Sequence, residues 1–130
     1  MKILVADVPQ MDARYTAAFG GWEVSFVRTG AEARKLLAAA RHDLVAVGVY
    51  FDDSRMFDLV RALRADRKYA AVPILCVRGN TGFMTVSTDT LETTVKALGA
   101  DVFLDLVHFA DDHAANQALR GAVALFFADR

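Results

Sequence analysis

The chain contains little of what marks a secreted, membrane-spanning or nucleic-acid-binding protein. A single cysteine, Cys76, occurs among its 130 residues, which excludes an intrachain disulfide framework and fits a reducing compartment. No apolar stretch approaches the length of a membrane span, and the amino-terminal segment MKILVADV is too short for a secretory signal. A formal net charge of −1 gives no electrostatic reason to expect a nucleic acid or an anionic membrane as a partner. We therefore expect a soluble, cytoplasmic protein.

The composition is that of an ordinary globular protein. Hydrophobic residues make up 55% of the chain, and 130 residues are enough to bury a core as one domain. We find no internal repeat and no linker. Residues 80–94 are rich in threonine and serine and are expected to form a surface loop and the start of a helix. The sequence thus predicts a single domain over residues 1–130.

Five segments have the pattern of β-strands. The segments 2–8, 44–50 and 72–77 are nearly continuous apolar runs, which are typical of strands buried on both faces of a parallel sheet. The segment 22–27 alternates apolar and polar residues, which predicts a more exposed strand. The last expected strand covers residues 101–106.

Apolar residues at helical spacing separate these strands and follow the last one. The expected end signals of the helices are Gly20 and Gly21 after the first, Ser54 as N-cap of the third, Asp89 with Glu92 as a capping box of the fourth, Gly99 at its end, and Asp111 or Asp112 as N-cap of the fifth. Strict alternation of strand and helix predicts right-handed crossovers and a three-layer α/β sandwich around a five-stranded parallel sheet.

One glycine stands out at the end of the third expected strand. Gly48 interrupts an apolar run from Leu44 to Phe51, although strand interiors disfavour glycine. In an open parallel sheet, ligands bind beyond the carboxyl ends of the strands. The residues at or just after these ends are Asp7, Val8, Gly48, Asp52, Asp53, Arg78, Gly79, Asp105 and Leu106.

The order of five sequence pieces resembles the receiver domain of two-component response regulators, the CheY-like superfamily. The pieces are KILVAD, GWEVSFVRTGAEARKLL, HDLVAVG, VPILCVRG and ALGADVFL, and together they span nearly the whole chain. The resemblance implies a (βα)₅ doubly wound domain of flavodoxin-like topology with strand order 2-1-3-4-5. It also implies a role in two-component signal transduction.

The resemblance identifies which positions a working receiver would use. Such a domain takes a phosphoryl group from a histidine kinase onto an aspartate that ends its third strand. An acid pair after the first strand holds Mg²⁺, and a Thr or Ser of the fourth strand and a Lys of the fifth contact the phosphoryl group. In this sequence the matching positions are Asp7 and Val8 for the acid pair, Gly48 for the phosphoacceptor, Arg78 for the Thr or Ser, and Leu106 or, with a shift of one residue, Val107 for the Lys.

These replacements remove the chemistry of a receiver. Glycine has no nucleophile on which an acyl phosphate could form. With two carboxylates lost, Asp7 alone offers Mg²⁺ too few protein oxygens. Without Lys or hydroxyl donors, nothing is placed to stabilise a phosphoryl group in transfer. We expect a pseudo-receiver without catalytic residues, metal or cofactor.

The remaining charged residues near the strand ends suggest two hypotheses. Arg78 is expected either to neutralise Asp7, Asp52 or Asp53 in a locked, metal-free pocket, as Mg²⁺ would in a receiver, or to point to solvent. Alternatively, Asp52 or Asp53 serves as a relocated phosphoacceptor or Mg²⁺ ligand. A simpler interpretation makes both acids solvated loop residues.

The function that we predict is a phosphorylation-independent signalling and protein–protein interaction module. In the family the surface of helix four, strand five and helix five pairs domains or docks partners, so we expect a protein partner or a homodimer there. The residues chosen for this face are Leu91, Val95, Phe103 and Arg120. The loop at 80–94 is expected to shape partner choice. A further alternative is a small-molecule sensor, because Gly48 would leave room in the pocket.

Overall fold

A computed structural model describes residues 1–79 and 85–128. Its five strands form one parallel sheet in the order β2-β1-β3-β4-β5. This confirms the predicted doubly wound fold and its strand order. The strands are β1 (Lys2–Ala6), β2 (Glu23–Val27), β3 (Leu44–Gly48), β4 (Ile74–Arg78) and β5 (Val102–Asp105).

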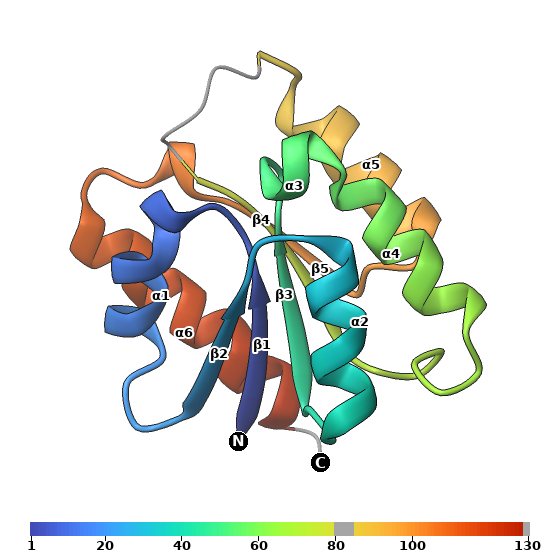
Figure 1. Cartoon of the computed structure of the whole chain (residues 1–130). Coiled ribbons are helices and arrows are strands. Elements are labelled where there is room, and N and C mark those ends of the chain that lie inside the picture. Colours follow the sequence, from blue (N-terminus) through green and yellow to red (C-terminus); the bar gives the residue numbers. More distant parts are fainter. Residues whose placement is uncertain (80–84, 129–130) are drawn as a thin grey trace.

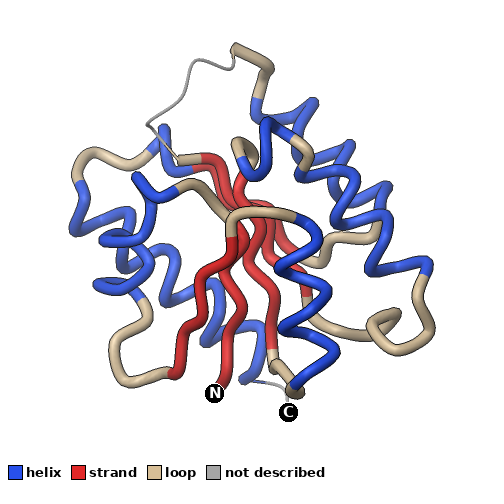
Figure 2. Tube along the Cα trace, viewed as in Figure 1, coloured by secondary structure: helices blue, strands red, loops and turns tan. Residues whose placement is uncertain are grey.

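Helices cover both faces of the sheet and make three layers, as Figures 1 and 2 show. One face carries α1 (Asp12–Ala18) and α6 (Asp112–Ala128). The other face carries α2 (Gly30–Ala39), α4 (Met56–Ala65) and α5 (Thr88–Leu98). Short turns of helix follow three of the strands: η1 (Pro9–Met11), α3 (Phe51–Ser54) and η2 (Leu106–His108). No helix in the described ranges is long and apolar enough to span a membrane.

The sheet separates two apolar layers of the core. Because side chains alternate along a strand, Leu4 and Ala6 of β1 pack toward α2, α4 and α5, whereas Ile3 and Val5 pack toward α1 and α6. Every residue of β3 and β4 is buried, and β2 is the more exposed strand. The continuous apolar runs and the alternating run in the sequence predicted this difference.

Some of the expected helix ends are confirmed and others are wrong. Gly99 ends α5 with a φ of 115°, and Asp111 caps α6 by accepting a hydrogen bond from the Ala114 N–H at 2.8 Å. The capping box of Asp89 is wrong, because Ser87 is the N-cap of α5 and accepts from the Thr90 N–H at 3.1 Å. Asp89 lies one residue inside the helix, where its charge still favours the first turn.

The connection from β3 to α4 also differs from the prediction, because Ser54 is not an N-cap. Asp52, Asp53 and Ser54 all have left-handed backbones, with φ of 48°, 56° and 63°, and α4 begins only at Met56. Each such residue costs about 1–2 kcal/mol relative to the right-handed conformation. The fully buried Phe51 anchors the start of this turn, and the Asp52 carboxylate accepts a hydrogen bond from the Gly30 N–H at 3.1 Å.

Candidate functional site

Gly48 provides the space into which Asp7 extends. β1 and β3 are neighbours, so the residue after β1 lies beside the end of β3. A Cβ atom added to Gly48 would lie 2.0 Å from the Cγ atom of Asp7, much closer than non-bonded carbon atoms approach, so the Asp7 side chain would have to move. The position that the sequence predicts for the phosphoacceptor therefore has no side chain, and a neighbouring carboxyl group fills its place.

Asp7 is buried and held by two hydrogen bonds. Its side chain is 2% exposed, the Tyr15 hydroxyl donates to Oδ2 at 2.7 Å, and the Val8 N–H donates to Oδ1 at 2.7 Å. Burial raises the pKa of Asp7 from 3.8 to about 6, although both hydrogen bonds act in the opposite direction. Arg28 donates to the Asp7 carbonyl oxygen at 3.0 Å and pairs with Asp12. The cation beside Asp7 is thus Arg28.

Replacing Asp7 with asparagine is expected to stabilise the protein near neutral pH. Because its pKa is higher in the folded chain, Asp7 favours folding less and less as the pH rises from about 4 to about 6. Above that range, the free energy of unfolding is about 3 kcal/mol lower than it is when Asp7 is protonated. Asparagine removes the buried charge, and its amide can donate to the Tyr15 oxygen. Urea unfolding between about pH 4 and about pH 7.5 measures the difference.

The control for this prediction is Asp58→Asn, which changes an exposed carboxylate on α4. It should alter the free energy of unfolding by no more than about 0.5 kcal/mol at any pH. An Asp7→Asn protein that is less stable than the unchanged chain at about pH 7.5, or equally pH-dependent, would contradict the account of Asp7.

Arg78 forms a buried ion pair with Asp105. Both residues end their strands, they are partners in the β4–β5 register, and each is 5% exposed. The guanidinium donates to Asp105 Oδ2 from Nε at 3.0 Å and from Nη2 at 2.5 Å. Burial alone would raise the pKa of Asp105, but the bonds from Arg78 and Thr88 outweigh it and hold that pKa below its usual value. Asp105 is therefore charged at neutral pH.

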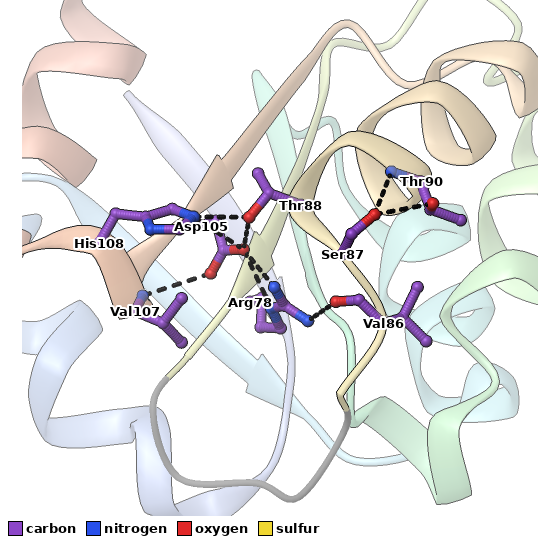
Figure 3. Close-up of polar contacts among 8 residues, drawn as sticks. All are labelled: Arg78, Val86, Ser87, Thr88, Thr90, Asp105, Val107 and His108. Carbon is purple, nitrogen blue, oxygen red and sulfur yellow. Dashed lines mark hydrogen bonds and ion pairs between the residues drawn. The ribbon is translucent and has the colours of Figure 1, made fainter.

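The ion pair extends to the start of α5 and to η2, as Figure 3 shows. Arg78 Nη1 donates to the Val86 carbonyl oxygen at 2.5 Å, and the Val107 N–H donates to Asp105 Oδ1 at 3.3 Å. The Thr88 hydroxyl donates to Asp105 Oδ2 at 2.7 Å and lies 2.5 Å from His108 Nε2. Because that hydroxyl has one proton, His108 Nε2 must be the donor to it. We call Arg78, Val86, Thr88, Asp105, Val107 and His108 the strand-tip network.

The expected pairing of Arg78 with Asp7, Asp52 or Asp53 is wrong. Within the described residues its carboxylate partner is Asp105, and no ion pair joins it to the other three. The order of the strands explains the separation from Asp7, because β3 lies between β1 and β4, which puts the tips of β1 and β4 about 10 Å apart. Asp105 lies on the adjacent strand. Asp52, in the turn after β3, instead accepts a hydrogen bond from the Gly30 N–H.

The other predicted positions are divided between core and surface. Of the two residues predicted for the lysine position, Leu106 is buried in the core and Val107 is 45% exposed, while Val8 is half-buried. Asp52 is bound to the start of α2, and Asp53 is an exposed residue of the left-handed turn. Neither acid shares a hydrogen bond or ion pair with Asp7 in the described part of the chain.

The residues present do not form a magnesium site of the receiver type. No group of three His, Cys, Asp or Glu side chains in the described ranges is arranged to hold a metal ion. The Asp7 carboxylate is the one matched acid, and both its oxygens already accept hydrogen bonds from the protein. The Asp7 carboxyl group occupies the space beside Gly48, which argues against an empty ligand pocket there.

Three of the four residues expected on the interaction face are buried. Leu91, Val95 and Phe103 lie in the core under α5. Arg120 is exposed, but its guanidinium stacks 4.2 Å from the centre of the Trp22 ring and donates to the Gly20 carbonyl oxygen at 2.8 Å. It therefore belongs to the contact of α6 with the α1–β2 connection. Part of the loop at 80–94, residues 80–84, lies outside the described residues.

Several residues of these clusters escaped the sequence prediction. The sequence does not predict the contacts of Tyr15 and Arg28 with Asp7, or those of Thr88 and His108 beside Arg78. The pair of Arg78 with Asp105 had a usable signal, because both end adjacent strands in the predicted order. The contacts of Arg28 and His108 depend on turns that no motif in the sequence specifies.

Comparison with solved structures places this arrangement in a known fold. The phosphorylated cyanobacterial phytochrome response regulator RcpA superposes with a TM-score of 0.79 at 16% identity, covering 99% of this chain and 95% of that one. The Mn²⁺-bound response regulator Rcp1 gives 0.76 at 11% identity, covering 96% and 93%. The chemotaxis response regulator CheY4 of Vibrio cholerae gives 0.70 at 24% identity, covering 92% and 96%.

The chain has the receiver fold. The similarity is one of structure alone. No protein-family model and no curated protein sequence matches the chain. The family's fourth helix corresponds to α5 here and its fifth to α6, because the short α3 is also numbered.

Proposed function

We propose that the chain is a signalling module of two-component systems that acts by protein–protein interaction and without phosphorylation. The observation that carries the proposal is the position of the Asp7 carboxyl group, 2.0 Å from where a Gly48 side chain would begin. At this position the chain has no aspartate side chain to accept a phosphoryl group and no space for one. We therefore expect neither enzymatic activity nor phosphoryl transfer from this chain.

The strand-tip network supports the second half of the proposal. In a receiver, residues at the ends of strands four and five contact the phosphoryl group, so their positions depend on phosphorylation. Here the corresponding strands are joined by the ion pair of Arg78 with Asp105, at 2.5 Å. A permanent guanidinium–carboxylate pair replaces a transient phosphoryl contact and holds this edge of the sheet in one arrangement.

The network also positions two exposed apolar side chains. Val86 is 39% exposed and Val107 is 45% exposed, so both apolar side chains are accessible to a partner beside the network. The carbonyl of Val86 accepts from Arg78, and the N–H of Val107 donates to Asp105. We assign the partner, a second copy or another protein, to the face of α5, β5 and α6 next to these residues. The buried Leu91, Val95 and Phe103 support this face from below.

A comparison with and without a phosphodonor tests the proposal. Light scattering should give the same mass, whether of one chain or of two, before and after acetyl phosphate and Mg²⁺ are added. The reason is that no acceptor side chain is present beside Asp7. A mass that changes only when the phosphodonor is present would contradict the proposal and would favour an acceptor at Asp52 or Asp53.

A further inference from the structure

A hollow of about 540 Å³ lies at the edge of the sheet opposite the strand-tip network. Its walls are the end of α2, the segment that leads into β3, and the segment that leads into β4. These segments lie toward the lower edge of the molecule in Figure 1, where the strands begin. The volume falls within the range of small-molecule sites, which is about 300–1,000 Å³.

The lining combines an apolar wall with positive charge. Leu37, Val72 and Pro73 are apolar, and Tyr69 adds a half-buried ring that packs against the core. Arg41 and Lys68 are exposed, and neither side chain has an ion pair in the described part of the chain. The acid in the lining, Asp43, accepts a hydrogen bond from the Lys2 backbone N–H at 2.7 Å and keeps its charge. Because two cations face this one carboxylate, the hollow has a net positive charge.

His42 adds a buried polar atom to the same lining. The residue is 7% exposed, and its Nδ1 lies 3.0 Å from the Ala40 carbonyl oxygen. Because a carbonyl only accepts, Nδ1 carries a proton, and Nε2 of the neutral ring is an acceptor. Nε2 is buried and has no hydrogen-bond partner among the described residues. Buried polar atoms without a partner are few in native proteins, so this unpartnered acceptor in a residue of the lining is unusual.

One wall of the hollow is held in place by Arg64. Its Nη1 donates to the carbonyl oxygens of Tyr69 and Ala70 at 3.2 Å and of Val72 at 2.7 Å, and its Nε donates to the Gly99 carbonyl at 2.8 Å. The segment before β4 is thus ordered without a ligand. A site that is already ordered loses little conformational entropy when a ligand binds.

We propose that this hollow binds a small organic anion that carries an apolar ring and a hydrogen-bond donor, such as an aromatic hydroxycarboxylate. Arg41 and Lys68 bind the anionic group, the wall of Leu37, Tyr69 and Val72 packs against the ring, and the donor is directed to the side of His42. The site lies apart from Asp7 and Arg78, so it does not depend on the proposed signalling function.

An NMR titration of the ¹⁵N-labelled chain with 3-hydroxy-2-naphthoate tests this proposal. We expect saturable shifts of amide signals confined to residues 37–43 and 68–73. Arg41→Glu should weaken the binding at least tenfold. Arg34→Glu makes the same charge change on α2 outside the hollow, and it should leave the affinity within twofold. Amide spectra of both variants without the probe check that they are folded, as expected for exposed positions.

Two companion probes separate the ring from the charge. Inorganic phosphate carries the charge without the ring, and 2-naphthol carries the ring and a donor without the carboxylate, so both should bind at least tenfold more weakly. The proposal is overturned by the absence of saturation up to about 10 mM, which corresponds to less than about 3 kcal/mol of binding free energy. Equal affinity of the two arginine variants, or shifts centred on the strand-tip network, would overturn it as well.

Discussion

Replacing Arg78 with methionine is expected to lower the free energy of unfolding by about 3–5 kcal/mol, because Asp105 is left as an unpaired buried charge. The side chains of Arg78 and Asp105 are only 6% and 2% exposed, and Arg78 Nη2 lies 2.5 Å from Asp105 Oδ2. Methionine keeps the volume of the aliphatic stem of arginine and removes the guanidinium, so the loss reports mainly on the charged group and its hydrogen bonds. Guanidinium unfolding at about pH 7 measures the change.

Two further variants make this prediction specific. Arg61→Met breaks an exposed pair with Asp58, at 3.5 Å, and should cost no more than about 1 kcal/mol. Arg78→Met combined with Asp105→Leu removes both charges, and it should recover most of the loss caused by Arg78→Met alone. A loss of less than about 1 kcal/mol in Arg78→Met would contradict the assignment of a buried ion pair.

Replacing Gly48 with alanine is expected to lower the free energy of unfolding by about 2–4 kcal/mol. The new Cβ would lie 2.0 Å from the Asp7 Cγ and Oδ1 atoms. Relieving this contact moves the carboxyl group away from the Tyr15 hydroxyl and the Val8 N–H, so overpacking and lost hydrogen bonds both contribute. Gly48→Asp should cost more, because it adds a second carboxylate beside the first. Urea unfolding measures both variants.

Combining the Gly48 substitution with one at Asp7 tests this prediction. In a chain with Asp7→Ala, the clashing carboxyl group is absent, so adding Gly48→Ala should cost at least about 1 kcal/mol less than it does in the unchanged chain. Gly121→Ala, in the interior of α6 with open space around its Cα, should cost nothing or stabilise by up to about 1 kcal/mol. Additive effects of the Asp7 and Gly48 changes would show that the two positions do not compete for space.

The fold was predictable because it depends on patterns that repeat along the chain. The apolar runs that became β1, β3 and β4 are buried on both faces, and helical spacing between them required crossovers. The local ends were harder to predict. Ser54 has the chemistry of an N-cap, but burial of Phe51 and the bond from Gly30 to Asp52 hold the preceding turn in a left-handed conformation. Tertiary contacts decided this turn.

At the site, too, some features follow from the identity of a residue and others depend on tertiary packing. That Gly48 lacks a nucleophile follows from its identity, but the occupation of its space by Asp7 follows from the packing of β1 against β3. The hypothesis that Arg78 takes the place of Mg²⁺ beside Asp7 is wrong because it leaves out the adjacency of β4 and β5. Asp105 is the neighbour of Arg78 in the sheet register, whereas Asp7 lies beyond β3.

The most direct test of the central claim, that the strand tips are set by the protein's own side chains and not by a phosphoryl group, is a titration with Mg²⁺ and beryllofluoride. This phosphoryl mimic binds at the acceptor carboxylate of a receiver, so ¹⁵N amide spectra would report it at Val8, Val49, Gly79 and Val107. We predict that these signals do not move beyond the change produced by the same ionic strength of a simple salt. Saturable shifts at these amides that require both Mg²⁺ and beryllofluoride would contradict the account.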